Sequence, residues 1–215
     1  MSGLVGDYIY TDELGRPVLR KLRSEPKRFK MAAALHRHDR LYWKSGPRCV
    51  ERYQADWAMK AMLNLPCLLD ALRRGEPVFL TEGERDCQTL SSLQKVAVTT
   101  NWQGAGEFTR QQAGWFVYGG GRSQVTIFLD RDDAGHWAAW QRYSLLTEVG
   151  VAPERITMLR PAATRHKDLT DVAQEGLLPD AFRRVSPRLA RHRAEAYGAV
   201  RAARYAFEWT PEVVS

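Results

Sequence analysis

Short apolar runs alternate with helix-like segments through the middle of the chain. The runs PVFLT, VAVTT, VTIFL and RITMLR begin at residues 77, 96, 125 and 155, and each is followed by a loop or by a segment with helical periodicity. Continuous apolar runs of this length fit strands that are buried on both faces, and strands that alternate with helices imply a parallel sheet. The pattern predicts an α/β domain over residues 76–178, with a parallel sheet of about four strands and helices on both faces.

The chain on either side of this domain has a different pattern. Near the start, YIYTDELGRPVLRKLR alternates around a turn in which Gly15 can take the left-handed conformation, which predicts a β-hairpin. Residues 31–48 show no clear period and predict loops. We expect a basic α+β subdomain over residues 1–75 and a basic helical tail over residues 179–215, where arginine and alanine follow a helical pattern.

Positive charge is concentrated in the N-terminal part of the chain. The formal net charge is +7, and the segment from Arg16 to Lys60 alone holds 13 lysines or arginines against 4 acids. Aromatic residues such as Phe29 and Trp43 are interleaved with these cations. Cations can neutralise phosphates and aromatic faces can stack on bases, which favours a nucleic-acid surface. A solvated basic surface above core aromatics fits the composition equally well.

The sequence shows neither a membrane segment nor a disulfide framework. No apolar stretch is long enough to cross a bilayer, and the first residues lack the basic start and apolar run of a secretory signal. Cys49, Cys67 and Cys87 are far apart and form no Cys-x-x-Cys pair, so we expect free thiols and no zinc site. These features indicate a soluble, cytoplasmic protein with no membrane contact.

Acidic residues follow three of the four predicted strands. Glu82 comes after PVFLT, Asp130 and Asp132 come after VTIFL, and Asp168 and Asp171 come after RITMLR and a loop. Because the carboxyl ends of parallel strands meet at one edge of the sheet, these acids should converge there. Converging carboxylates repel one another unless cations neutralise them, and their hard oxygen atoms suit Mg²⁺ or Mn²⁺. Two such ions can clamp a phosphoryl group during in-line displacement.

Each acid also has a purely structural interpretation. Glu82 could be a turn residue, and Asp168 with Asp171 could form a capping arrangement at the last helix. Asp133, which follows Asp132, is interpreted as the cap of the helix that begins there. Taken singly, each structural interpretation is as good as a metal role, but three acidic groups at equivalent strand ends favour a metal site.

The segments VFLTEGERD, IFLDRDDAG and KDLTD, in this order and spacing, resemble the motifs of the Toprim domain, a Rossmann-like catalytic fold. That family includes bacterial and phage primases, topoisomerases, recombination mediators and some nucleases. The resemblance implies that Glu82 is the acid/base group and that Lys167 contacts phosphate. It also implies a site for Mg²⁺ or Mn²⁺, most simply two ions, held by Asp130, Asp132, Asp168 and Asp171.

The Gly-rich segment TTNWQGAGEF brings the resemblance closest to the phage and bacterial primase branch. That branch has lysine and tryptophan after Gly-Ala-Gly, whereas this chain has Glu107 and Phe108. An acid therefore stands where a basic residue near the substrate is usual, which questions the contact of that position with nucleotide or template.

Three functions are compatible with this resemblance. The first is a primase-like nucleotidyltransferase that makes short primers from nucleoside triphosphates on single-stranded DNA. The second is a metal-dependent nuclease that uses water as the nucleophile, and the third is a non-catalytic nucleic-acid-binding module. In the primase, basic residues of the first subdomain would hold the phosphates of the template: Arg20, Lys21, Arg23, Lys27 and Arg28.

The resemblance also leads to expectations about partners and source. Neither a zinc ribbon nor a helicase accompanies the motifs in this sequence. Either a helicase or a zinc-module protein acts in trans, or the protein primes with little sequence choice, or it does not prime. The expected source is a bacterial cell, with a gene carried by a phage or a mobile element as one origin.

Overall fold

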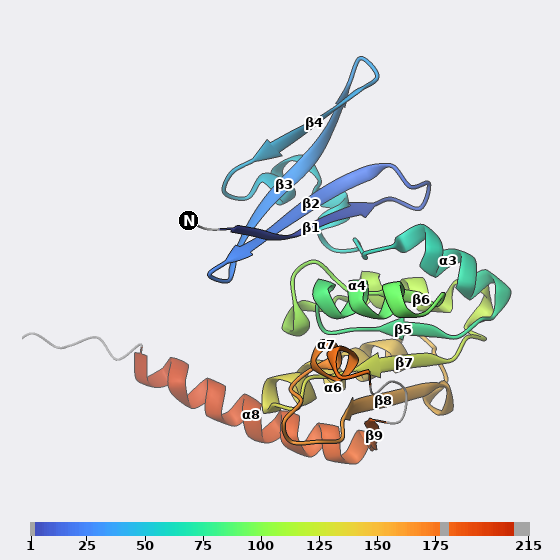
Figure 1. The fold of residues 1–215 in the computed structure, drawn as a ribbon, viewed down its shortest axis with the longest axis vertical. Helices are drawn as coiled ribbons and strands as arrows, with labels where there is room; N and C mark the ends of the chain where they lie inside the picture. The colour runs from blue at the N-terminus through green and yellow to red at the C-terminus, as the bar shows by residue number, and fades with distance from the viewer. Residues whose placement is uncertain (1–2, 177–180, 209–215) are drawn as a thin grey trace, which may run out of the picture.

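The molecule contains two β-sheets, one antiparallel and one mostly parallel (Figure 1). The computed structural model describes residues 3–176 and 181–208. The first sheet has the strand order β1-β2-β3-β4, and the second has the order β6-β5-β7-β8-β9. Across the described residues, no helix has both the length and the apolar character that crossing a membrane requires.

The N-terminal sheet is a meander of four antiparallel strands. The predicted hairpin is confirmed, and Gly15 lies at its turn with a φ of 81°. Asp12 fastens this turn, because its Oδ1 accepts hydrogen bonds from the backbone amides of Leu14 and Arg16. The strands are β1 (Gly3–Thr11), β2 (Pro17–Glu25), β3 (Arg28–Arg37) and β4 (Arg40–Ser45).

The prediction of loops over residues 31–48 is wrong, because most of that segment belongs to β3 and β4. In β3, the consecutive residues Ala32, Ala33 and Ala34 are all buried. This run of small buried side chains hides the alternation that usually marks a strand. Two short helices follow the sheet, α1 (Cys49–Tyr53), which packs against β3, and α2 (Ala55–Ala58).

The second sheet confirms the predicted α/β arrangement. Strands β5 to β8 are parallel, as the apolar runs predicted, and β9 adds an antiparallel edge strand beside β8. The strand β9 was not predicted, because its sequence FRRV carries two exposed arginines and lies in a segment with a helical pattern. The strands are β5 (Val78–Leu80), β6 (Ala97–Thr99), β7 (Val125–Phe128), β8 (Ile156–Pro161) and β9 (Phe182–Val185).

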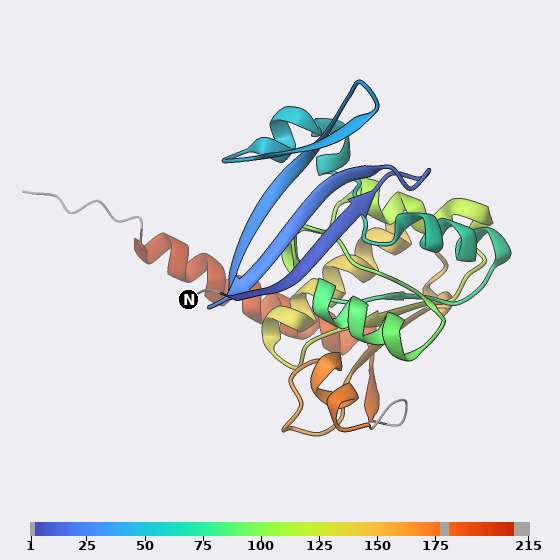
Figure 2. The same ribbon diagram turned by 45° about the horizontal axis from the view of Figure 1, so that its top comes forward.

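Helices cover both faces of this sheet. They are α3 (Leu65–Arg74), α4 (Glu84–Leu93), α5 (Arg110–Gly114), α6 (Asp133–Glu148), α7 (Leu169–Gln174) and α8 (Pro187–Glu208), with 3₁₀ turns η1 (Ala105–Glu107), η2 (Trp115–Gly120) and η3 (Pro153–Arg155). One face packs on α3, α6 and α8 through residues such as Leu72, Ile127 and Leu146. Helix α8 runs beside α6, and its C-terminal half extends away from the rest of the molecule (Figures 1 and 2).

The other face of the parallel sheet joins the two sheets into one core. Its Phe128 belongs to a buried cluster with Leu90 of α4, Leu169 of α7 and Tyr10 of the N-terminal sheet. Burial of these apolar side chains holds the N-terminal sheet in a fixed place over the parallel one. The carboxyl ends of β5 and β7 therefore face strand β2 across a cleft, which is lined by residues from both sheets.

Candidate active site between the two sheets

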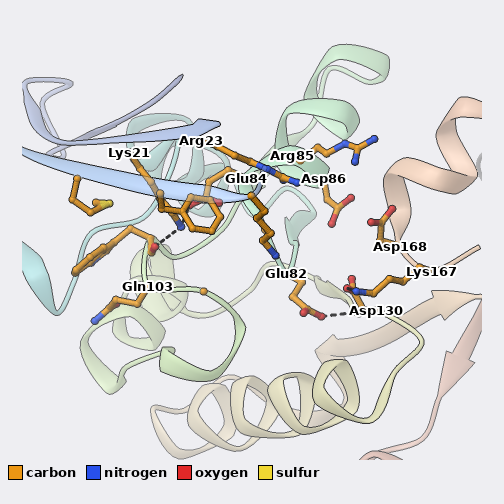
Figure 3. A pocket seen from close by; sticks show the side chains of 16 residues that line it. Lys21, Arg23, Glu82, Glu84, Arg85, Asp86, Gln103, Asp130, Lys167 and Asp168 are labelled. Atoms are coloured by element: carbon orange, nitrogen blue, oxygen red, sulfur yellow. Dashed lines mark hydrogen bonds and ion pairs between the residues drawn. The ribbon is translucent and has the colours of Figure 1, made fainter. Parts of the chain in front are cut away.

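A cleft of about 480 Å³ opens at the carboxyl edge of the parallel sheet (Figure 3). One wall carries acids and a lysine from the ends of β5, β7 and β8, and the other comes from β2, β3 and their connecting turn. The loop after β6 closes one side with Trp102, Gln103 and Gly104. The charged and aromatic side chains that line the two walls are Glu82, Glu84, Arg85, Asp86, Asp130, Lys167 and Asp168 on the first, and Lys21, Arg23, Lys27 and Phe29 on the second.

Glu82 lies two residues after the end of β5 and points toward the loop after β7 (Figure 3). Its Oε2 accepts a hydrogen bond from the backbone amide of Asp130 at 3.1 Å. Beneath it lies the buried Arg142 of α6, whose Nη2 donates to the carbonyl of Glu82 at 3.4 Å and to Asn101 Oδ1 at 2.8 Å. Burial lowers the pKa of Arg142 to about 10, although the charges of Glu82 and Asp130 oppose this shift. Arg142 therefore supports Glu82 from within the core, a role that sequence alone did not indicate.

Asp130 is a largely buried carboxylate among other acids. Its side chain is only 15% exposed. Burial raises the pKa of Asp130 to about 8, and the charges of Glu82 and Asp86 act in the same direction, while Lys167 opposes them. A carboxylate in such surroundings is stabilised in its charged form when a cation lies beside it.

Asp132, and not Asp133, is the N-cap of α6. The backbone of Asp132 is extended, and its side chain accepts a hydrogen bond from the amide of Gly135 at 2.8 Å. The prediction that Asp133 caps the helix is therefore wrong, because Asp133 already has helical geometry and a capping residue must precede the helix. The Asp133 side chain is 63% exposed, and its Oδ1 lies 3.5 Å from Arg193 Nη1.

The KDLTD segment leads into α7, and its first two residues, Lys167 and Asp168, line the cleft. Asp168 is the N-cap and accepts a hydrogen bond from the amide of Asp171 at 2.9 Å, while Asp171 accepts one from the amide of Lys167 at 2.8 Å. The interpretation of Asp168 as a helix cap is confirmed, whereas Asp171 does not complete a reciprocal capping box, because it accepts from Lys167 and not from the Asp168 amide. Asp168 still lines the cleft beside Asp130, whereas Asp171 is not among its lining residues.

Lys167 contacts two acids of the loop after β7. Its Nζ lies 3.6 Å from Asp130 Oδ2 and 3.5 Å from Asp132 Oδ2. The charge of Asp130 raises the pKa of Lys167, and Asp132 adds to this effect against an opposing contribution from burial. The ammonium group thus occupies a position between two carboxylates where positive charge is favoured.

Asp86 is a cleft residue that sequence reasoning missed. It lies in the first turn of α4, is 8% exposed, and its Oδ1 accepts hydrogen bonds from Thr170 N at 3.0 Å and Thr170 Oγ1 at 2.5 Å. Burial raises the pKa of Asp86 to about 6, and Asp168 and Glu82 contribute in the same direction while the hydrogen bonds from Thr170 oppose it. Its place four residues after Glu82, in the first turn of the helix that follows β5, was the available indication that both acids lie at the same edge.

The predicted template residues separate into two groups. Arg23 and Lys27 line the cleft, and so does Lys21, although the Lys21 ammonium is buried and lies 2.5 Å from Glu84 Oε1 and 2.7 Å from the Trp102 carbonyl. Two other predicted residues are not brought there. Arg20 pairs with Asp7, with Nη2 at 2.6 Å from Oδ2, and Arg28 lines a separate hollow beside β1 and β2.

The acidic wall fits a hard divalent cation in its chemistry. Its oxygen donors are of the kind that Mg²⁺ and Mn²⁺ prefer, and the Lys167 ammonium shows that positive charge is accepted between Asp130 and Asp132. Within the described ranges, however, no group of three or more histidine, cysteine or acidic side chains is already arranged to hold an ion. Side chains such as those of Glu82 and Asp168 would have to turn toward a metal for it to bind.

Sequence comparisons identify no relative of this chain. No protein-family model matches it, and no curated protein matches it. Its fold, in contrast, is similar to that of solved primase structures.

The primase fragment of the bacteriophage T7 primase-helicase is 19% identical, with a TM-score of 0.53 over 80% of this chain and 59% of that one. In a second T7 structure, the lagging-strand DNA polymerase interacts with two primase domains bound to an RNA/DNA hybrid and dTTP. This structure is 20% identical, with a TM-score of 0.51 over 87% of this chain and 75% of that one. The primase of Aquifex aeolicus, with its zinc-binding and RNA polymerase domains, is 17% identical, with a TM-score of 0.53 over 94% of this chain and 43% of that one.

These similarities show a shared mixed α/β fold. The chain spans less than two thirds of the T7 fragment and less than half of the Aquifex aeolicus protein.

Proposed function

We propose that the protein is a Toprim-like primase core that joins ribonucleotides on a single-stranded DNA template. The observation that carries the proposal is the cleft itself. Its acidic wall, with Glu82, Asp130 and Asp168, faces a wall that carries Arg23 and Lys27. Such an arrangement suits a reaction in which phosphates are held on one side and metal-dependent chemistry takes place on the other. The similarity in fold to primase fragments supports the proposal.

In this proposal the residues of the acidic wall have distinct roles. Asp130, Asp168 and the half-exposed Asp132 would hold Mg²⁺ or Mn²⁺, which when bound would supply positive charge to the α-phosphate and the leaving pyrophosphate. Glu82 would accept the proton of the attacking 3′-hydroxyl, since its carboxylate is held toward Asp130 by the 3.1 Å hydrogen bond. Lys167 would leave Asp130 and Asp132 and contact phosphate, which its 62% exposed side chain is free to reach. Asp171, the fourth ligand that the resemblance implies, would act only indirectly, by holding the Lys167 backbone.

The opposite wall would hold the template. Arg23 and Lys27 can contact backbone phosphates, and Phe29, which is 47% exposed, offers a face on which a base can stack. Lys21 Nζ lies 4.6 Å from the centre of the Phe29 ring, so the ring is already in contact with positive charge. A strand crossing this wall would place a nucleotide opposite Glu82.

The Gly-rich loop departs from the primase branch in a way that the fold explains in part. Phe108 is buried at 3% exposure and packs edge-on against Phe116, so it serves the core in place of a tryptophan. Glu107 ends the turn η1 and is exposed. We infer that Glu107 makes no phosphate contact and that Lys27 and Lys167 supply the positive charge near the nucleotide.

Primer synthesis is the direct test of the proposed function. Purified protein, single-stranded DNA, four ribonucleotides and Mg²⁺ or Mn²⁺ should yield short oligonucleotides on a denaturing gel, and a labelled template in the same gel reports any cleavage. Absence of product with intact template and retained binding would indicate a non-catalytic binding module. Cleavage that needs Asp130 would indicate the nuclease.

The proposal includes partners that act in trans. A zinc-module protein would choose the initiation site and a helicase would supply single-stranded template. Addition of such a partner should raise the yield or the sequence preference of primers without changing the dependence on Asp130.

A further inference from the structure

A second group of basic side chains lies outside the cleft, on the face of the parallel sheet that α6 and α8 cover. Arg160 of β8 stands directly opposite Arg183 of β9 in the register of the antiparallel pair. Like charges at directly opposed positions destabilise a sheet unless an anion neutralises them. Two arginines from neighbouring elements join this pair. The arginine cluster consists of Arg131, Arg160, Arg183 and Arg193.

Arg160 lies close enough to the other three arginines to be repelled by each of them. Burial lowers the pKa of Arg160, and the charges of Arg131, Arg193 and Arg183 lower it further. His136, in the first turns of α6, lies beside the same group, because Arg193 and Arg160 add to the lowering of its pKa that burial causes. The His136 ring is fully buried, and its Nε2 has no hydrogen-bond partner among the described residues. A loop, two strands and a helix thus bring four guanidinium groups to one region, beside the buried His136 of a second helix.

The described part of the chain supplies little negative charge to this cluster. Arg193 Nη1 lies 3.5 Å from Asp133 Oδ1, which is its one ion pair there. Arg131 Nη1 donates to the carbonyl of Ala162 at 2.8 Å, and this uncharged oxygen does not neutralise the charge of the guanidinium group. For Arg160 and Arg183 the described residues provide no carboxylate within 4.0 Å. The cluster is therefore a site of excess positive charge with planar guanidinium donors, which bind phosphate groups well.

The arginine cluster continues the acidic wall of the cleft. Arg131 lies between Asp130 and Asp132 in the sequence, and Arg193 pairs with Asp133, so the cluster begins where the acids end. We propose that the arginine cluster binds the backbone phosphates of a nucleic-acid strand that extends beyond the acidic wall. The choice of a strand over a protein rests on the proposed function of the cleft. The choice over a free nucleotide rests on the spread of the donors over the elements β8, β9 and α8.

Binding measurements that need no catalysis test the proposal. Fluorescence anisotropy would follow the full chain, without divalent metal, on a short labelled oligothymidylate that only crosses the cleft and on a much longer one. The variants are Arg183→Gln and Arg193→Gln. The matched control is Arg184→Gln, which removes an exposed arginine from the opposite face of the same strand. Thermal melts show whether each variant is folded. Because Arg183 is exposed, its replacement should disturb the fold least.

The expected result is a selective effect on the long strand. Each cluster variant should weaken its binding about threefold to tenfold at moderate salt, and the slope of the salt dependence should fall by about 0.7 for each phosphate that is no longer neutralised. Binding of the short strand and binding by Arg184→Gln should match the wild type. The proposal is overturned if the cluster variants bind the long strand normally, if Arg184→Gln weakens binding as much, or if short and long strands weaken equally. It is also overturned if only ATP or pyrophosphate binding falls.

The outcome is separate from that of the proposed function. A chain that makes no primers but binds the long strand more weakly after Arg183→Gln would refute the primase proposal and leave the cluster as a strand-binding surface. A chain that makes primers and binds long strands equally well in all variants would refute the cluster alone.

Discussion

At the scale of single residues, the acidic wall is a set of carboxylates held closer together than their charges favour. Asp130 shares its surroundings with Glu82, Asp86 and Asp168, and the Lys167 ammonium opposes their repulsion. Groups with perturbed pKa values in a cleft are candidates for function, because the fold keeps them there against an electrostatic cost. The geometry therefore makes Asp130 the residue whose charge should matter most for a reaction at this site.

Replacement of Asp130 tests this expectation. Asp130→Asn keeps the shape of the side chain and removes its charge, so primer synthesis should fall by roughly 100-fold or more, because the charge that would hold the metal is removed. Single-strand binding should be unchanged or tighter, since repulsion of phosphate falls. The control Asp133→Asn, three residues away and 63% exposed, should retain activity. Equal loss in both variants would mean that the segment, and not the Asp130 charge, is required.

Asp86 should make stability depend on pH. The pKa of Asp86 is about 6 in the folded protein against an ordinary value of 3.8, so the folded state holds this proton to a higher pH than the unfolded chain does. Ionisation of Asp86 therefore costs stability progressively as pH rises from about 4 to 6, and the full cost remains at higher pH.

Asp86→Asn removes this cost while its amide oxygen can still accept both hydrogen bonds from Thr170. In metal-free buffer at pH 7 to 8, the free energy of unfolding should rise by roughly 1–3 kcal/mol, and the gain should vanish below about pH 4. Urea unfolding at several pH values measures this. A gain that persisted at low pH would assign the effect to packing.

At the scale of elements, the close contact between α6 and the loop after β7 positions the acids. A Cβ atom on Gly135 would lie 2.5 Å from the Asp130 carbonyl oxygen and 2.9 Å from its backbone nitrogen. Backbone cannot move aside as the end of a flexible side chain can. Glycine at this position lets the helix begin directly beneath Asp130, and the amide of Gly135 also completes the Asp132 cap.

Gly135→Ala should therefore disturb the site as well as the fold. We expect a loss of about 1–3 kcal/mol in the free energy of unfolding, because the added methyl group overpacks the contact. Activity should fall under conditions where the variant is still folded. The control Gly114→Ala, in α5 with no neighbouring atom within 4 Å, should leave stability unchanged or raise it by about 0.4–1 kcal/mol. Similar unfolding curves for the two variants would contradict this account.

The sequence predicted the buried strands of the parallel sheet better than the strands with exposed or small side chains. The strands β5 to β8 were predictable because burial on both faces requires continuous apolar runs, and their parallel order delivers Glu82, Asp130 and Asp168 to one edge. The strands β3, β4 and β9 were missed. Three buried alanines in β3, a mostly exposed β4 and two exposed arginines in β9 leave no apolar alternation.

Within the site, the limits came from contacts between distant segments. Asp86 of α4 meets Thr170 of α7, and Lys21 of β2 meets Glu84 of α4. Neither contact leaves a local pattern in the sequence. The predicted helix cap, Asp133, and the observed one, Asp132, differ by a single position. Sequence periodicity does not define the first residue of a helix that accurately.

At the scale of the whole molecule, a buried ion pair fastens the N-terminal sheet to helix α4 of the α/β domain. Lys21 Nζ and Glu84 Oε1 lie 2.5 Å apart with both side chains 8% exposed, and Tyr10 donates to the same carboxylate oxygen at 2.7 Å. Removal of the lysine leaves a buried carboxylate without its cation, which is far more costly than removal of both charges together.

A double-mutant cycle should show this coupling. Lys21→Met should lower the free energy of unfolding by about 3–5 kcal/mol, and Glu84→Gln added to it should restore most of the loss. Chemical denaturation of the two single variants and the double variant measures the coupling. The result would be contradicted by additive losses, which would mean that the two side chains stabilise the fold independently.

The strand connections imply an order of folding. The meander β1 to β4 pairs neighbours in the sequence, whereas β5 pairs with β7 only after a long intervening segment has been ordered. Contacts between sequence neighbours form faster than distant ones, because closing short loops costs less chain entropy. The N-terminal sheet should therefore gain structure early, and the cleft should be the last feature to be completed. During refolding, recovery of single-strand binding should lag behind recovery of the first β-structure.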